Sequence, residues 1–181
     1  YIVADKLAPL PPQNLDAEES VLGAMMLSPH QIQVTAELGL KPEEFYRASH
    51  GLIYKLMQAM NDAGEPVDAI TVADKLEQMG KLEEMGGRAR IHEIATLVPS
   101  VSNAGHYAKI IREHALARGL TVAGEQIARL GWEKQDDPAT MMEKAEEALR
   151  RVVDQSARTR PASTLADGLE EIGKAVSEAR R

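Results

Sequence analysis

Apolar residues between positions 14 and 100 recur at the three- and four-residue spacing that is typical of amphipathic helices. Asn14 or Asp16 can cap the first of these helices, and Pro29 ends it. Later helices are predicted at residues 31–38, from Ser49 to a turn at 63–66, and at residues 71–79 and 88–97. Because strict alternation of apolar and polar residues never lasts long enough for a strand, the pattern predicts an all-α fold.

The chain after residue 100 has longer helical patterns. Ser102 can cap a helix that continues to Leu130, which is long for a globular protein. After a turn, Asp137 and Pro138 are a strong helix start, because a carboxylate caps free N–H groups and proline suits the first helical position. The return helix reaches about Gln155, with an apolar stripe of Met141, Met142, Ala145, Ala148, Leu149 and Val152. Two long helices joined by a short turn predict an antiparallel helical hairpin.

The last segment is predicted to be a separate helix that begins after a polar linker. A lone amphipathic helix has nothing of its own against which to bury its apolar face, so we expect it to dock on another surface. Its docking residues would be Leu165, Leu169, Ile172 and Val176. The predicted organisation is an irregular arm (1–13), a small helical head (14–100), the hairpin (101–155), the linker (156–164) and a separate linker helix (165–181).

Small residues mark one face of the first hairpin helix. Ala115, Gly119 and Ala123 repeat every four residues, and Gly124 and Ala128 lie alongside. Glycine inside a helix costs about 1 kcal/mol relative to alanine, so two glycines this close imply a compensating close approach of another helix. That helix can be the return helix of the same chain or a helix of another subunit. The flanking apolar residues widen this surface beyond what one partner helix needs; they are Leu116, Leu120, Ile127 and Leu130.

Composition restricts the classes of function. The chain has no cysteine, which excludes disulfides and thiolate metal sites and suits a reducing compartment, so we predict a cytoplasmic protein. The net charge of −7 provides no basic footprint for phosphate contacts, so we expect no autonomous binding of nucleic acid. No apolar run is long enough for a membrane span, and no signal peptide is visible.

The sequence offers only weak candidates for a catalytic, metal or cofactor site. Gly168, Gly173 and Lys174 match the spacing of a phosphate-binding loop, but Ala175 stands where a magnesium-binding hydroxyl is needed and no strand precedes the segment. The histidines form no His-Glu-x-x-His pair, and His50, at a helix start, is expected to be a packed or capping residue. We therefore predict no catalytic residue, no metal ligand and no cofactor site in this chain.

Four sequence blocks together resemble the N-terminal domain of the bacterial replicative DNA helicases, the DnaB family. The blocks are Leu10-Pro-Pro-Gln-Asn-Leu-Asp-Ala-Glu-Glu-Ser-Val-Leu-Gly23, Phe45-Tyr-Arg-Ala-Ser-His-Gly-Leu-Ile-Tyr54, Glu65-Pro-Val-Asp-Ala-Ile-Thr-Val72 and Val98-Pro-Ser-Val-Ser-Asn103. Each block is weak alone, but four in this order and spacing are hard to obtain by chance. Asp68 also lies in a matching block, and capping the helix that contains Thr71 is enough to explain it.

The resemblance implies an assembly and recruitment role. In this family the hairpins pair between subunits, six copies close a ring, and the linker helix docks on a neighbouring subunit's motor domain. The ring also binds the C-terminal domain of primase, and a helicase loader is a further possible partner. Carried over by position, these contacts fall on Arg118, Leu120, Thr121 and Ile127. With the small-residue face, the predicted interface is Ala115, Leu116, Arg118, Gly119, Leu120, Thr121, Ala123 and Ile127.

The resemblance also implies that the ATPase motor, which uses ATP and magnesium, lies beyond residue 181. The fragment itself is then no enzyme, whereas its parent is an ATP-dependent DNA helicase. The alternative hypothesis is a free-standing helical adaptor or loader-like protein that shares only the hairpin. A parent gene that continues into a Gly-x-x-x-x-Gly-Lys-Thr motif would distinguish the two.

Overall fold

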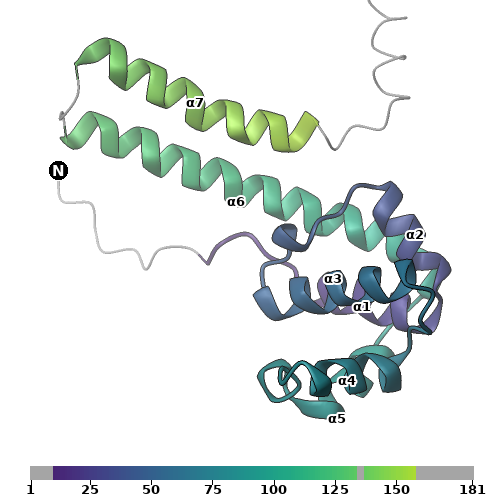
Figure 1. Ribbon diagram of the computed structural model, residues 1–181. Coiled ribbons are helices and arrows are strands. Elements are labelled where there is room, and N and C mark those ends of the chain that lie inside the picture. The colour runs from purple at the N-terminus through teal and green to yellow at the C-terminus, as the bar shows by residue number, and fades with distance from the viewer. Residues whose placement is uncertain (1–9, 134–136, 158–181) are drawn as a thin grey trace, which may run out of the picture. The chain divides into compact units, whose positions relative to one another are not determined.

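The computed structural model describes residues 10–133 and 137–157, which contain seven α-helices, three short 3-10 helices and no strand (Figure 1). This confirms the all-α prediction. The chain divides into two compact units, Tyr1–Thr121 and Val122–Arg181. The first unit therefore extends past the predicted end of the head at residue 100 and includes the first part of the long helix α6 (Ala104–Glu133).

The first unit begins with α1 (Leu15–Leu27) and α2 (His30–Glu37). Asn14 is the N-cap of α1, and its side chain accepts a hydrogen bond from the Ala17 backbone N–H at 2.9 Å. This observation decides between the two caps that the sequence offered. The 3-10 helix η1 (Pro42–Glu44) follows, and then α3 (Ala48–Asp62).

Helix α4 (Ala69–Gln78) is capped by Asp68 as predicted, because one carboxylate oxygen accepts the backbone N–H groups of Ile70 and Thr71 at 2.8 and 2.9 Å. The Thr71 hydroxyl in turn accepts the Asp68 N–H at 2.9 Å, which completes a reciprocal capping box. The Thr71 N–H bond, first among several, lowers the pKa of Asp68 below its usual value.

Helix α5 (Gly87–Thr96) follows the 3-10 helix η2 (Glu83–Met85) and packs on α1. The two helices meet at Gly23, where an added Cβ would lie 2.3 Å from the Ile94 carbonyl oxygen and 2.3 Å from Val98 Cγ2. Only glycine permits this approach, so Gly23 sets how closely the two helices pack.

The core of the first unit is built from aliphatic side chains and methionine with two central aromatic rings. The Phe45 and Tyr54 ring centroids lie 5.1 Å apart, and the Tyr54 hydroxyl donates to the Leu40 carbonyl at 3.1 Å. Burial raises the pKa of Tyr54 above its usual value. The largest fully buried apolar side chains are Tyr54, Leu22, Met25, Ile32, Ile53, Met57, Leu76, Ile91, Ile94, Ile111 and Val21.

The long helices agree with the predicted hairpin segments, since α6 ends at Glu133 and α7 (Pro138–Ala157) begins at the predicted proline. The prediction that Ser102 caps α6 is wrong. Ser102 lies inside the 3-10 helix η3 (Val101–Asn103), and its hydroxyl lies 3.0 Å from that of Ser100. Residues 158–181, with the predicted linker helix, lie outside the described residues.

Candidate functional site

The second unit contains the last part of α6 and all of α7, which run side by side (Figure 1). Asp137 fixes the start of α7, because it accepts the Ala139 and Thr140 backbone N–H groups at 3.0 and 3.1 Å. The Thr140 hydroxyl donates to its other oxygen at 2.6 Å, and this bond, first among several, lowers the pKa of Asp137. The start signal read from Asp137 and Pro138 is confirmed.

The apolar surface of α7 is only partly covered. Ala148 and Val152 are buried, and Met141 and Ala145 are half-buried. Three larger side chains next to this face are exposed: Met142 at 63%, Leu149 at 48% and Val153 at 59%. We call these three residues the α7 stripe. Met142 and Leu149 belong to the apolar stripe predicted from the sequence, and their exposure shows that the apolar arc of α7 is wider than its covered part.

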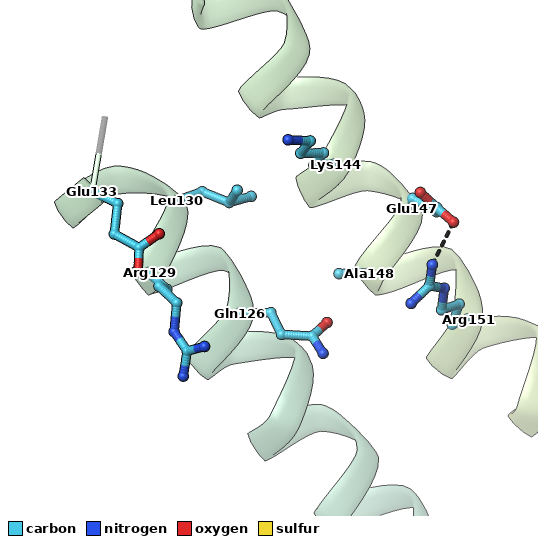
Figure 2. Close-up of a pocket in the computed structure, with 8 residues that line it drawn as sticks. All are labelled: Gln126, Arg129, Leu130, Glu133, Lys144, Glu147, Ala148 and Arg151. Carbon is cyan, nitrogen blue, oxygen red and sulfur yellow. Dashed lines mark hydrogen bonds and ion pairs between the residues drawn. The ribbon is translucent and has the colours of Figure 1, made fainter. Parts of the chain in front are cut away.

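A pocket of about 300 Å³ lies between the two helices (Figure 2). It is lined from α6 by Gln126, Arg129, Leu130 and Glu133, and from α7 by Lys144, Glu147, Ala148 and Arg151. Glu147 and Arg151 form an ion pair at 2.5 Å across one turn of α7. The lining carries both signs of charge without an activated nucleophile or an acid–base pair in an enclosed site, so it has no catalytic arrangement.

The small-residue face predicted on α6 is partly covered within the chain. Ala115 and Ala123 are buried, and Gly119 is half-buried. The contact of this face with another helix stays a prediction. Gly124 has open space around it, because an added Cβ would meet no atom within 4 Å.

The other predicted interface residues differ in exposure. Leu120 and Thr121 are exposed, whereas Leu116 and Ile127 are half-buried. The Thr121 hydroxyl donates to the Ala117 carbonyl of its own helix at 3.1 Å. The structure describes no partner chain, so the interface role of these residues stays a prediction. The linker-helix residues Leu165, Leu169, Ile172 and Val176 lie outside the described residues.

Arg118 is used inside the first unit. Its Nη1 donates to the Pro12 carbonyl at 2.7 Å and its Nη2 to the Glu44 carbonyl at 2.6 Å. The guanidinium also lies 5.6 Å from the centre of the Tyr46 ring, within cation–π range. Two turns earlier, Arg112 is buried, donates to the Leu38 carbonyl and approaches the Glu44 carboxylate at 3.4 Å. These arginines hold the start of α6 on η1.

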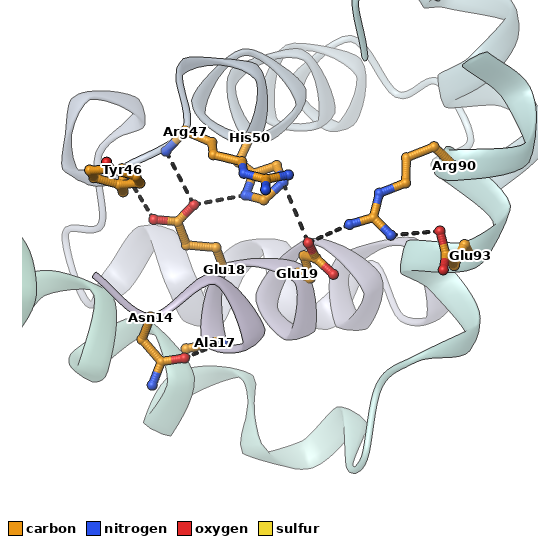
Figure 3. Close-up of polar contacts among 9 residues, drawn as sticks. All are labelled: Asn14, Ala17, Glu18, Glu19, Tyr46, Arg47, His50, Arg90 and Glu93. Carbon is orange, nitrogen blue, oxygen red and sulfur yellow. Dashed lines mark hydrogen bonds and ion pairs between the residues drawn. The ribbon is translucent and has the colours of Figure 1, made fainter. Parts of the chain in front are cut away.

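A buried polar cluster joins α1 to α3 (Figure 3). The Glu18 carboxylate accepts the Tyr46 and Arg47 backbone N–H groups at 2.6 and 3.4 Å and lies 2.7 Å from His50 Nδ1. Arg47 is the N-cap of α3 and gives no side-chain cap, but Glu18 accepts the N–H of this N-cap residue and of the residue before it from another helix. His50 is buried, which confirms the prediction of a packed histidine, and the second sequence block is thereby tied to the first.

Glu19 continues this cluster toward α5. Its carboxylate lies 3.9 Å from His50 Nε2 and pairs with Arg90, which also bonds Glu93 at 2.6 Å (Figure 3). Every charged group here has a partner, so the cluster stabilises packing. Within residues 10–133 and 137–157, no group of three or more carboxylates and imidazoles can hold a metal ion. No helix in the same part of the chain is both long and apolar enough to cross a bilayer.

Two exposed apolar side chains of α6 in the second unit were not predicted from the sequence. Trp132 is 86% exposed near the end of α6, and Val122 is 52% exposed. Trp132 is the only tryptophan of the chain and falls in the predicted turn, which is the signal that could have found it. An exposed tryptophan on an ordered helix is typical of contact surfaces between proteins.

Comparison with known proteins agrees with this geometry. A family model described as the DnaB-like helicase N-terminal domain matches residues 10–113. The chain is 40% identical over 143 residues to the replicative DNA helicase DnaC of Bacillus subtilis, with 79% of this chain and 31% of that protein covered. It is 37% identical over 143 residues to DnaB of Geobacillus stearothermophilus, with the same shares covered.

Solved structures show the same fold. The N-terminal domain of DnaB helicase from Mycobacterium tuberculosis matches with a TM-score of 0.72 and 38% identity, covering 78% of this chain and 99% of that chain. A second match, with a TM-score of 0.55, 24% identity, and 88% of this chain and 35% of that chain covered, is a DnaB-like replicative helicase described with its interactions with primase.

The described residues form an all-helical domain with exposed apolar side chains on a helical hairpin. The chain belongs to the DnaB-like helicase N-terminal domain family, since the family model covers more than half of it. It spans less than a third of the length of the two replicative helicases named above.

Proposed function

We propose that this chain is the assembly and recruitment part of a hexameric bacterial replicative helicase, and that it assembles by pairing of its hairpin with the hairpin of a second copy. The observation that carries the proposal is the exposed α7 stripe of Met142, Leu149 and Val153. Membership of the family favours this hypothesis over a free-standing adaptor.

The energetics of the second unit support an intermolecular contact. The apolar residues that the structure describes as buried in this unit, Ala123, Ala148 and Val152, are small, whereas the side chains of the α7 stripe are exposed. Helical stability in proteins comes mainly from packing an amphipathic face, and two helices with so little buried surface gain little. A second hairpin against the stripe would bury the missing apolar surface.

The α7 stripe suits a second copy of itself. A second copy presents the same exposed apolar side chains, so a two-fold contact would bury the stripe of each chain against the stripe of the other. Such a two-fold contact uses the same surface on both subunits.

Recruitment of primase is the second part of the proposal. A DnaB-like replicative helicase of the same fold is described together with its interactions with primase, which supports the C-terminal domain of primase as a partner here. Of the predicted contact residues, Leu120 and Thr121 are exposed and therefore accessible to it. Arg118 would act indirectly, because its guanidinium already bonds Pro12 and Glu44.

The motor activity belongs to the parent in this proposal. The helicases that this chain matches extend well beyond the matched part, so ATP and magnesium would bind there and the present chain would neither hydrolyse ATP nor unwind DNA. The predicted linker helix, residues 165–181, would dock on a neighbouring subunit through its apolar face.

A calorimetric titration of this chain with the C-terminal domain of primase from the same organism tests the proposal, with the mass of the sample measured by light scattering. We expect saturable binding to a dimer or larger species. Leu149→Glu should weaken self-association, whereas Leu149→Met, which keeps an apolar side chain of similar volume, should preserve it. A chain that stays monomeric and does not bind primase would overturn the proposal.

A further inference from the structure

The pocket between the last part of α6 and α7 is separate from the surface that the proposed assembly uses. None of its lining residues belongs to the α7 stripe. Both walls belong to the second unit, so the pocket lies within one compact part of the chain. Its volume of about 300 Å³ is at the lower end of the range for pockets that bind small organic ligands.

Positive charge is concentrated at this pocket, although the second unit is acidic. The basic residues in the described part of the unit are Arg129, Lys144, Arg150 and Arg151. All except Arg150 line the pocket. The acidic residues are more numerous; they are Glu125, Glu133, Asp137, Glu143, Glu146, Glu147 and Asp154. Because only Glu133 and Glu147 among them line the pocket, its lining carries a net positive charge, which favours an anionic ligand.

Hydrogen-bond donors lie on both walls of the pocket. Figure 2 shows the Gln126 side chain extending from α6 toward α7, with Arg151 on the facing wall. Arg151 donates through Nη2 to Glu147 at 2.5 Å, and in the described part of the chain its Nη1 and Nε form no hydrogen bond. The Gln126 amide likewise has no partner among the described residues. Because a guanidinium has several N–H groups in one plane, an anion between the walls can accept bonds from Arg151 and Gln126 together.

The two acidic lining residues do not cancel this attraction. Glu147 is already paired with Arg151. Glu133 lies one turn after Arg129 on α6, a spacing at which opposite charges commonly interact. Each carboxylate of the lining thus has a guanidinium one turn away, which reduces its repulsion of an anion.

Apolar side chains form the remaining part of the lining. Leu130 on α6 is half-buried, and Ala148 on α7 is buried. An inorganic anion would contact the donors but leave this apolar part uncovered. A ligand with an anionic group and a short aliphatic chain complements both parts of the pocket.

We propose that this pocket binds a small organic anion, whose carboxylate or phosphate group is held by Gln126 and Arg151 and whose aliphatic chain packs on Leu130 and Ala148. A ligand in this place contacts α6 and α7 at once. Because the apolar residues described as buried in the second unit are small, such a ligand adds contacts that the two helices lack, and it stiffens the hairpin.

Titration of the full chain with four probes at constant ionic strength tests the chemistry of the pocket. Hexanoate and hexyl phosphate carry an anionic group on the same aliphatic chain, hexanol carries the chain alone, and inorganic phosphate carries the charge alone. We expect saturable binding of hexanoate or hexyl phosphate, with a Kd about tenfold or more below that of hexanol and of inorganic phosphate. The tighter of the two anionic probes identifies the group that the pocket prefers.

Two neighbouring arginines provide matched variants. Arg151→Gln removes a donor of the pocket and should raise the Kd about tenfold or more. Arg150→Gln removes the same charge outside the pocket and should leave the Kd within about twofold. Gln126→Glu, on the other wall, places a negative charge beside the anion and should also weaken binding. Bound ligand should slow hydrogen exchange at residues 126–133 and 144–151, because it contacts both helices, and circular dichroism checks that the variants keep their helical content.

The outcomes separate this site from the proposed assembly. Equal loss of binding in Arg151→Gln and Arg150→Gln would overturn the site, because it would show attraction by net charge alone. Binding of hexanol as tight as that of hexanoate, or no saturable binding of any probe, would overturn it as well. Light scattering on the same samples reports the mass independently: a monomer that binds hexanoate through Arg151 would overturn the assembly and leave the site standing, and a dimer that binds no probe would do the reverse.

Discussion

Glu18 on α1 and His50 on α3 are joined at 2.7 Å between a carboxylate oxygen and Nδ1, inside the first unit. The same carboxylate accepts two backbone N–H groups that precede α3, at Tyr46 and Arg47. One buried side chain of the first helix thus fixes the entry of the third helix, and it connects two sequence blocks that are separate along the chain.

Glu18→Gln should destabilise the first unit by about 2–4 kcal/mol, because the amide accepts fewer bonds and the buried partners lose their charge-assisted acceptor. Urea unfolding followed by circular dichroism measures the change. Glu83→Gln is the matched control, since Glu83 is exposed, and its effect should stay within about 0.5 kcal/mol. Equal midpoints for the two variants would show that Glu18 does not hold α3.

Gly23→Ala should destabilise the first unit by about 1–3 kcal/mol, although alanine is the better helix former. The reason is that the new methyl group would lie 2.3 Å from the Ile94 carbonyl, which is backbone and cannot rotate away. Thermal unfolding gives the measurement.

Gly124→Ala should stabilise the chain, because Gly124 is a helical glycine with open space around it. The free energy of unfolding should rise by roughly 0.5–1 kcal/mol, since only the helix propensity changes. If both alanine variants stabilised the chain, the close contact of α1 with α5 would be refuted.

Local signals in the sequence predicted much of the fold. Asn14, Asp68 and Asp137 cap helices through N–H groups two or three residues away, so the cap and the helix start can be read together. Ser102 is also a residue type that favours N-caps, but it does not cap α6, because residues 101–103 form a 3-10 helix before α6 begins. Nothing local distinguishes the two cases.

The features that sequence reasoning missed depend on distant partners. Glu18 reads as an acidic residue at a helix start, and only the tertiary fold places it under α3. The apolar residues of α7 were correctly assigned to a helix, but periodicity does not tell how wide a face the neighbouring helix covers. The exposure of Met142 and Leu149 therefore could not be predicted from the sequence. Trp132 was passed over because the predicted helix ended at Leu130.

Asp68→Ala should cost about 1 kcal/mol at neutral pH through loss of the α4 cap. The folded pKa of Asp68 is lowered, chiefly by the Thr71 N–H bond, so the carboxylate's contribution is present above the unfolded pKa of about 3.9 and is lost as pH falls through the folded pKa. The difference in unfolding free energy between wild type and Asp68→Ala should therefore shrink below about pH 4. Asp68→Asn keeps a capping oxygen and should follow the wild type at neutral pH. A difference in unfolding free energy between wild type and Asp68→Ala that stays constant from pH 7 to pH 2.5, within the range in which the fold survives, would contradict a charge-dependent cap.

Arg118→Lys distinguishes an internal role from a direct partner contact. Lysine cannot reach the Pro12 and Glu44 carbonyls with two separate donors or stack as a plane near Tyr46, so the first unit should lose roughly 1–2 kcal/mol of stability. Hydrogen exchange should also rise at the backbone N–H groups of residues 13–17, next to the released Pro12. Arg129→Lys, at an exposed arginine of the same helix, is the control and should leave unfolding unchanged. If Arg118→Lys left stability and exchange unchanged but abolished primase binding, Arg118 would be a partner contact, and its bonds to the first unit would be energetically unimportant.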